Sequence, residues 1–313
     1  MERVEETEQV SSQSTSAGNA SLAESSPRDR ANTPLVPQQA IEPCPTCAIP
    51  GAVPPSFVYA IGEIDWLPSN ESLDQEISQV LEIRKEELKG LGRFEAQKKI
   101  LLEPENRYIV RQLCWVLRIE TLQTYILQPR DPADYKVLVD AFRPHSRENI
   151  DVIIGVRGPI APPEVCNGLG LPIVVFDQLY SFDREMLIKS IPKPPKAKAK
   201  EFEGGADDLF KRIQQMSDNH GATDEHRAVN YLAVRSSEIY KCAHDAVVDG
   251  YWLTSLDVVA SRLSGSRGRR IFDVVLTYTN PTSRVARKWF WRVDVTGEYP
   301  FIVTGQQEYY DRS

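Results

Sequence analysis

The stretch GVRGPIAPPEVCNGLGLPIVVFDQLYSF, residues 155–182, decides the fold of the part of the chain around it. Two short apolar runs flank its central loop: DVIIGV at 151–156 and IVVF at 173–176. Both are rich in β-branched residues and bounded by turn residues, which is typical of buried strands. The prolines between them fix φ, and the glycines permit backbone angles that other residues avoid. We therefore expect a rigid loop between two strands, placed to present polar groups to a ligand.

The polar side chains of this stretch are the candidate binding residues, because carboxylates beside an arginine can grip a polar ligand or serve acid–base chemistry. A structural alternative has Asp177 ending a strand, Asp183 capping a helix and Arg157 pairing with one of the two. A second alternative is an enzyme that uses Asp177, Asp183 or Cys166. No catalytic constellation is complete and no subtilisin-type triad is present, so catalysis is not expected. The candidate binding residues are Arg157, Glu164, Asn167, Asp177, Gln178 and Tyr180.

Composition narrows the classes of partner. The chain has 313 residues, a net charge of -7 and 41% hydrophobic residues, so it can bury a core and lacks the basic balance of a general nucleic-acid binder. It contains no run of about 18 apolar residues and no signal peptide, so we expect no membrane partner and a cytoplasmic location. Its cysteines should then be reduced, and a disulfide framework is not expected.

Changes in composition divide the chain. Residues 1–53 are polar and form a disordered leader that contains a CxxC pair. Residues 54–191 form a first α+β domain of mixed helices and strands. Residues 192–205 combine prolines, lysines and glycines without apolar periodicity, which is typical of a linker. Residues 206–313 form a second α+β domain. Whether the two parts are independent is left open.

The helices and strands of the first domain are predicted from helix-capping residues and from changes in the spacing of apolar residues. A strand begins at Ser56, and Asn70 or Ser72 caps the helix that follows it. The run 114–127 changes to period two and predicts one strand or a hairpin. A further helix spans 131–142, with Asp131 as its cap and proline at its first position.

The second domain is predicted as helices followed by an antiparallel meander. Thr223 caps a helix that continues to about residue 246. Three strands follow at 253–263, 269–279 and 285–296, and short turns between them imply antiparallel pairing. Trp289 and Trp291 share one face of the last strand, which is more typical of a core than of a contact surface.

The spacing of the cysteines indicates a zinc site as one alternative. Cys44 and Cys47 have the spacing of half a zinc site, and Cys242 with His244 would be the other half. Fallback ligands are His220, His226, Cys114 and Cys166. The competing interpretation is free thiols in a flexible segment. A zinc-stabilised structural or dimerisation module, as a homodimer, is therefore an alternative function.

Several long runs resemble a known family. They are PPSFVYAIGEI at 54–64, ENRYIVRQLCWVLRIETLQTYILQPRDPADY at 105–135, DVIIGVRGPIAPPEVCNGLGLPIVVFDQLYSFD at 151–183, GATDEHRAVNYLAVR at 221–235 and VDVTGEYPFIVT at 293–304. They are similar to the C-terminal region of the cyanobactin maturation proteins PatG and PatA, where the region is a domain of unknown function that follows a protease or macrocyclase domain.

The protease domain of that family has no counterpart in these residues, so its activity is not carried over. The resemblance implies an accessory module in the maturation of ribosomal peptides. We therefore expect a non-catalytic module that binds a precursor peptide or a maturation enzyme.

Overall fold

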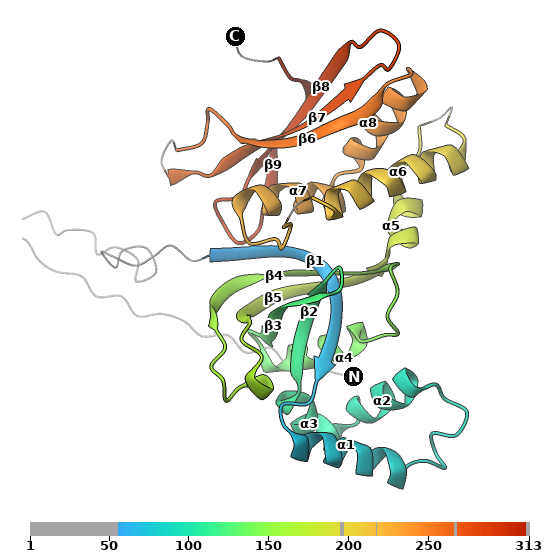
Figure 1. Cartoon of the computed structure of the whole chain (residues 1–313), viewed down its shortest axis with the longest axis vertical. Coiled ribbons are helices and arrows are strands. Elements are labelled where there is room, and N and C mark those ends of the chain that lie inside the picture. Colours follow the sequence, from blue (N-terminus) through green and yellow to red (C-terminus); the bar gives the residue numbers. More distant parts are fainter. Residues whose placement is uncertain (1–55, 195–196, 217, 266–267, 311–313) are drawn as a thin grey trace, which may run out of the picture. The chain divides into compact units, whose positions relative to one another are not determined.

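Strands of the N-terminal half close into a barrel in the order β1-β2-β3-β5-β4 (Figure 1). The structure is a computed structural model that describes residues 56–194, 197–216, 218–265 and 268–310. Neighbouring strands of the barrel are antiparallel except for β3 and β5, which are parallel. The strands are β1 (Ser56–Leu67), β2 (Cys114–Ile119), β3 (Leu122–Pro129), β4 (Asn149–Ile160) and β5 (Pro172–Asp183).

The first strand closes the barrel because it pairs both with β2, beside it in the strand order, and with β4, at the other end of that order. Residues 56–62 of β1 pair with β4, and residues 63–67 pair with β2. The change of neighbour falls at Gly62, where a Cβ atom would lie only 2.3 Å from the carbonyl oxygen of Arg118. Glycine is required here because the two backbones approach too closely for any side chain.

Both faces of the barrel wall are buried where the C-terminal half packs against it. In β1, Val58 and Ala60 belong to the core inside the barrel. Tyr59 and Ile61 belong to the other large core, which they share with the C-terminal helices. Strands buried on both faces read as continuous apolar runs, which explains why DVIIGV at 151–156 does not alternate.

Short helices follow the strands of the barrel, and two of their predicted caps are confirmed. The side chain of Asn70 accepts a hydrogen bond from the amide of Leu73 at 2.9 Å, and Asp131 accepts one from Ala133 at 2.8 Å. The helices are α1 (Glu71–Ile83), α2 (Arg93–Leu101), η1 (Pro104–Asn106), α3 (Arg107–Gln112), η2 (Pro132–Asp134), α4 (Tyr135–Ala141), η3 (Cys166–Gly168) and α5 (Arg184–Ser190).

Three helices and an open sheet make the C-terminal half, and the predicted antiparallel meander is confirmed in the order β6-β7-β8-β9. Thr223 caps α7 as predicted, by accepting from the amide of His226 at 3.2 Å. The fold class is therefore α+β, as predicted. The elements are α6 (Ala199–Gln214), α7 (Asp224–Arg235), α8 (Ser237–Val248), β6 (Trp252–Ala260), β7 (Ile271–Thr279), β8 (Ala286–Asp294) and β9 (Phe301–Glu308).

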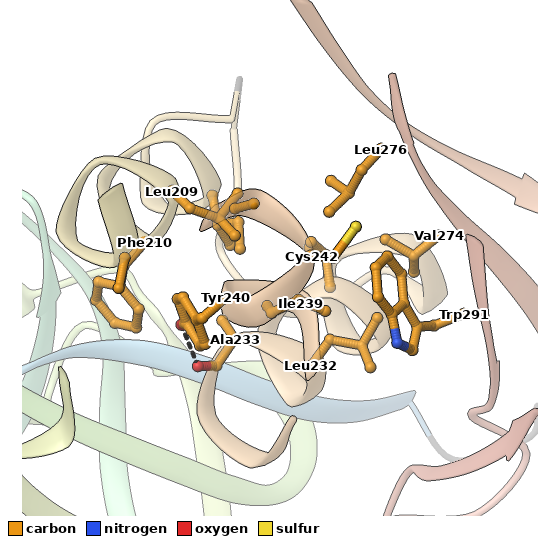
Figure 2. Packing of buried hydrophobic residues seen from close by; sticks show 14 of the residues in the cluster. Leu209, Phe210, Leu232, Ala233, Ile239, Tyr240, Cys242, Val274, Leu276 and Trp291 are labelled. Atoms are coloured by element: carbon orange, nitrogen blue, oxygen red, sulfur yellow. Dashed lines mark hydrogen bonds between the residues drawn. The ribbon is translucent and has the colours of Figure 1, made fainter. Parts of the chain in front are cut away.

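Figure 2 shows the core between these helices and the sheet. Trp291 of β8 is fully buried, so it belongs to the core and not to a contact surface. Leu232 of α7 and Cys242 of α8 belong to the same buried cluster. The hydroxyl of Tyr240 donates to the carbonyl of Ala233 at 2.5 Å and ties α8 to α7.

Two sequence expectations in this half are wrong in detail. The predicted linker 192–205 overlaps α6, which begins at Ala199. Fully buried Phe202 anchors that first turn in the core, and its spacing to Ala206 and Leu209 is helical. One apolar residue among lysines and glycines was too weak a signal. The helix predicted to reach residue 246 is also divided at Ser236, which occupies the N-cap position of α8 without a side-chain capping hydrogen bond.

The C-terminal half is joined to the barrel through the connection between α6 and α7. The amide of Tyr59 in β1 donates to the carbonyl of Gly221 at 2.9 Å, and the side chain of Asn230 donates to the carbonyl of Tyr59 at 2.9 Å. Gly221 has φ +75°, and a Cβ atom there would lie 2.4 Å from the Tyr59 oxygen. The described residues from Ser56 onward form one compact unit.

Candidate binding surfaces

The predicted binding residues follow the hairpin of β4 and β5 but do not converge on one site. Arg157, Glu164 and Asn167 are exposed on β4 and on the loop after it. Asn167 is in the left-handed region, with φ 57°. Tyr180 packs against the shared core instead, with the guanidinium of Arg235 5.3 Å from its ring centroid.

The other two predicted binding residues, Gln178 and Asp177, are bonded to or directed toward other residues of the protein. The hydroxyl of Tyr180 donates to the side chain of Gln178. Asp177 is the extra residue of a β-bulge, since Ile154 pairs with Gln178 and Gly155 pairs with Phe176. A bulge re-aims a side chain, and here it turns Asp177 toward charged neighbours.

Asp177 belongs to an ion-pair network. Arg130 donates to Asp177 at 2.8 Å and to Glu298 at 3.0 Å, and the hydroxyl of Tyr299 donates to Asp177. Asp183 instead lies 3.8 Å from Arg143. The two carboxylates of the enzyme alternative thus pair with different arginines. Arg157, which the structural alternative pairs with one of the two aspartates, is in neither of these ion pairs.

Cys166 is bonded to Cys114 by a disulfide, so the expectation of reduced cysteines without a disulfide is wrong for this pair. Cys166 offers no free thiolate as a nucleophile, and neither sulfur is free as a fallback zinc ligand. The bond fastens the loop between β4 and β5 over the start of β2. Cys114, Val116 and Ile126 are buried with Ala161 and Cys166 in a small separate core. Sequence spacing could not identify the pair, because the barrel brings the two residues together from a separation of 52.

The described half of the predicted zinc site is not preorganised for a metal. Cys242 is buried in the core, and burial raises the pKa of its thiol to about 12, away from the thiolate form that binds zinc. His244 contacts the ring of Phe202 with centroids 5.4 Å apart, and residues two apart on a helix face different directions.

No group of three or more His, Cys, Asp or Glu side chains within the described ranges could hold a metal. Cys44 and Cys47 lie outside the described residues, so a zinc site that includes them stays a prediction. None of the helices in the described part of the chain has the length and apolar character needed to cross a bilayer.

An open pocket lies beside Asp177. It has a volume of about 490 Å³ and is lined by Arg130, Asp131, Pro132, Asp134 and Asp177. Three of these five side chains are acidic. Arg130 is already engaged by Asp177 and Glu298, so the pocket presents mainly negative charge.

A second pocket adjoins the first at Pro132 and has a different character. Its volume is about 410 Å³, within the range of small-ligand sites. Its rim carries three cations, Arg107 and Arg111 of α3 and Lys136 of α4, with Tyr135 beside them. Its apolar wall is formed by Leu101, Leu102, Val110, Pro132, Ala133 and Val139.

The carboxylates near the pocket do not neutralise these three cations, because they are engaged elsewhere. Glu103 pairs with Arg84 at 2.8 Å, and Asp131 caps η2. Among the described residues, neither arginine of the rim nor Lys136 makes an ion pair. Burial raises the pKa of Tyr135, with Arg111 opposing the shift, so the phenol stays protonated and able to donate.

Sequence reasoning missed this second pocket, which we call the α3–α4 pocket. Arg107 and Arg111 are spaced i,i+4 and therefore share one face of α3, which was a readable signal. The position of Lys136 beside them depends on how α4 packs against α3, and no local pattern encodes that.

Comparison with known proteins shows a likeness to one family in sequence and to one solved structure in fold. Residues 196–309 match the family model described as PatG C-terminal. A solved structure described as "PatG Domain of Unknown Function" superposes with a TM-score of 0.63 at 17% sequence identity, covering 81% of this chain and 98% of that chain. No curated protein matches. The chain therefore resembles PatG, in sequence through residues 196–309 and in fold through most of its length.

Proposed function

We propose that the protein is a non-catalytic accessory module that binds a precursor peptide or a partner enzyme in the maturation of ribosomal peptides of the cyanobactin type. The match of residues 196–309 to the PatG C-terminal family supports the pathway. A binding role is favoured over catalysis because the candidate carboxylates lie in separate ion pairs and Cys166 lies in a disulfide.

The observation that carries the proposal is the open pocket at Asp177, a residue of β5 in the β4–β5 hairpin. Asp134 contributes a carboxylate to the pocket without making an ion pair among the described residues. Glu164 is exposed on the loop of the hairpin. The disulfide at Cys166 anchors the loop that carries Glu164 and limits its conformational freedom, and preorganisation of this kind favours binding.

The test is calorimetric titration of candidate precursor peptides and maturation enzymes into the full-length protein. Asp134→Lys and Glu164→Lys should each weaken the binding of a true partner by about tenfold, roughly 1.4 kcal/mol. Asp208→Lys is the matched control, because Asp208 is an exposed aspartate on α6 that lines neither pocket.

Either of two results would contradict the proposal. One is the absence of binding to every precursor and maturation enzyme tested. The other is release of a processed peptide, detected by mass spectrometry after incubation with the protein alone, since that would establish catalysis.

A further inference from the structure

The α3–α4 pocket combines an apolar wall with a positive rim on a protein whose net charge is -7. Positive charge is concentrated there even though acidic residues outnumber basic ones by 44 to 37. Arg107, Arg111 and Lys136 come from two helices and reach the same opening. Local charge opposite to that of the whole protein is what a site needs to attract an anionic ligand to one place.

The wall determines which anion fits. Val110 and Val139 are buried, and Leu102 is 42% exposed, so the pocket offers a deep apolar surface with an accessible edge. A free phosphate would leave this surface in water. A long nucleic acid would meet unfavourable charge at the neighbouring pocket, where Asp131 and Asp134 lie on the other side of Pro132.

The rim favours carboxylates at more than one position. Two arginines on one helix face and a lysine on the next helix can each engage a separate acidic group, because guanidinium groups pair readily with carboxylates. Tyr135 is half-buried, and its hydroxyl adds a hydrogen-bond donor that makes no hydrogen bond of its own among the described residues.

We infer that the α3–α4 pocket is a docking site for an acidic peptide segment, in which an apolar side chain enters between α3 and α4 while flanking Asp or Glu residues pair with Arg107, Arg111 and Lys136. This site adjoins the pocket at Asp177 but shares only Pro132 with it, and the inference does not depend on the role proposed in peptide maturation.

The test uses labelled peptides and fluorescence anisotropy with the full-length protein. The first peptide has a central Leu-Phe pair flanked by Asp and Glu. The second replaces each acid by Lys, and the third replaces Leu-Phe by Ser-Ser. The first peptide should bind at least about tenfold more tightly than either analogue, and its affinity should fall as salt is raised and the charges are screened.

Two kinds of substitution test the contributions of the charged rim and of the apolar wall to peptide binding separately. The double variant Arg107→Glu with Arg111→Glu should weaken the first peptide by at least about tenfold, whereas Arg147→Glu should not, since Arg147 is exposed and lies outside the pocket. Ala133→Trp fills the pocket and should also weaken binding, and Ala133→Ser is its matched control. If the double variant fails to fold, Lys136→Glu tests the same point.

Several outcomes would overturn the inference. Equal affinity for the acidic and basic peptides would remove the charge argument. Unchanged binding by both Arg107→Glu/Arg111→Glu and Ala133→Trp would place the peptide elsewhere. Tighter binding of dodecanoate or of a single-stranded oligonucleotide, in competition with the first peptide, would identify a lipid or a nucleic acid as the occupant.

Discussion

The barrel and the C-terminal sheet differ in whether their strands leave an open edge. Both are built from strands and both pack against helices, but every strand of the barrel has two neighbouring strands, while the sheet ends in β6 and β9, which have one neighbour each. The difference arises in β1, which changes neighbour at Gly62, whereas each strand of the meander keeps the same neighbours along its length. The alternation of apolar and polar residues along a strand therefore does not distinguish a closed barrel from an open sheet. The barrel differs from the sheet in having a strand that pairs first with one neighbour and then with another.

Removing one buried tryptophan from each region should have the largest effect. Trp115 lies in the barrel core and donates to the carbonyl of Val110 at 2.9 Å, and Trp291 of β8 lies in the core between the open sheet and its helices. Trp115→Ala and Trp291→Ala should each cost about 3–5 kcal/mol of unfolding free energy. Urea denaturation followed by circular dichroism measures both.

The two tryptophan variants also test whether the barrel and the C-terminal sheet unfold together. Because the core around Trp291 includes Tyr59 and Ile61 of the barrel, we expect one transition in the wild-type protein and in both variants. Hydrogen exchange that rises only in β6–β9 after Trp291→Ala would show instead that the sheet unfolds alone.

Loss of the disulfide should come next and should act on the barrel. Cys114→Ser with Cys166→Ser releases the loop over β2, and removing a disulfide of this kind costs about 2–4 kcal/mol. Dithiothreitol should lower the melting temperature of the wild type and leave that of the double variant unchanged. An equal response in both would show that the stabilisation does not come from this bond.

Gly62→Ala should test closure itself. The new Cβ would lie 2.3 Å from the Arg118 carbonyl, so β1 or β2 must shift, and overpacking of this kind costs about 1–3 kcal/mol. Gly158→Ala is the matched control, because its Cβ would meet the nearest atom, the Ile173 oxygen, at 3.4 Å. Faster amide exchange in β1 and β2, but not in β7, is the expected readout.

The smallest effect is a contrast in pH dependence between two buried aspartates. Burial raises the pKa of Asp151 in the barrel above its ordinary 3.8, although Ser181 and Arg143 oppose the shift. Burial also acts to raise the pKa of Asp294 in the sheet, but hydrogen bonds from Thr296 and Arg269 lower it overall.

The signs of the two contributions are therefore opposite. The contribution of Asp151 to stability is present below about pH 4 and is lost as the pH rises through its folded-state pKa. The contribution of Asp294 is present above about pH 4 and is lost as the pH falls through its folded-state pKa. Comparing Asp151→Asn and Asp294→Asn with the wild type by urea unfolding between pH 3 and 7 should show differences of opposite slope. Parallel slopes would contradict this assignment.

Local patterns predicted most of the elements. Caps at Asn70, Asp131 and Thr223 and the alternation in residues 253–296 depend on neighbours a few positions away, and those neighbours are visible in a sequence. The closed barrel was not predicted, because pairing of β1 with β4 joins residues nearly a hundred positions apart. The disulfide was missed for the same reason.

The candidate site was predicted less well than the fold. Polar residues between two strands indicated an exposed loop, and Arg157, Glu164 and Asn167 are exposed. The tertiary partners of Asp177 and Tyr180 could not be read from the sequence, because Arg130, Tyr299 and Arg235 come from other elements. The α3–α4 pocket exists only where two helices meet, so its rim could not be recognised in advance.

The contact between Gly221 and Tyr59 bears on how such proteins can be rearranged by recombination. Asn230 and Gly221 lie inside the segment that matches the family model, yet both make hydrogen bonds to the backbone of β1, far outside it. A gene fusion that transferred residues 196–309 alone would leave these groups and one face of α7 without their partner. Inheritance of this region should therefore carry a strand equivalent to β1 with it, and the boundary of the segment that matches the family model is not the boundary of the unit that folds.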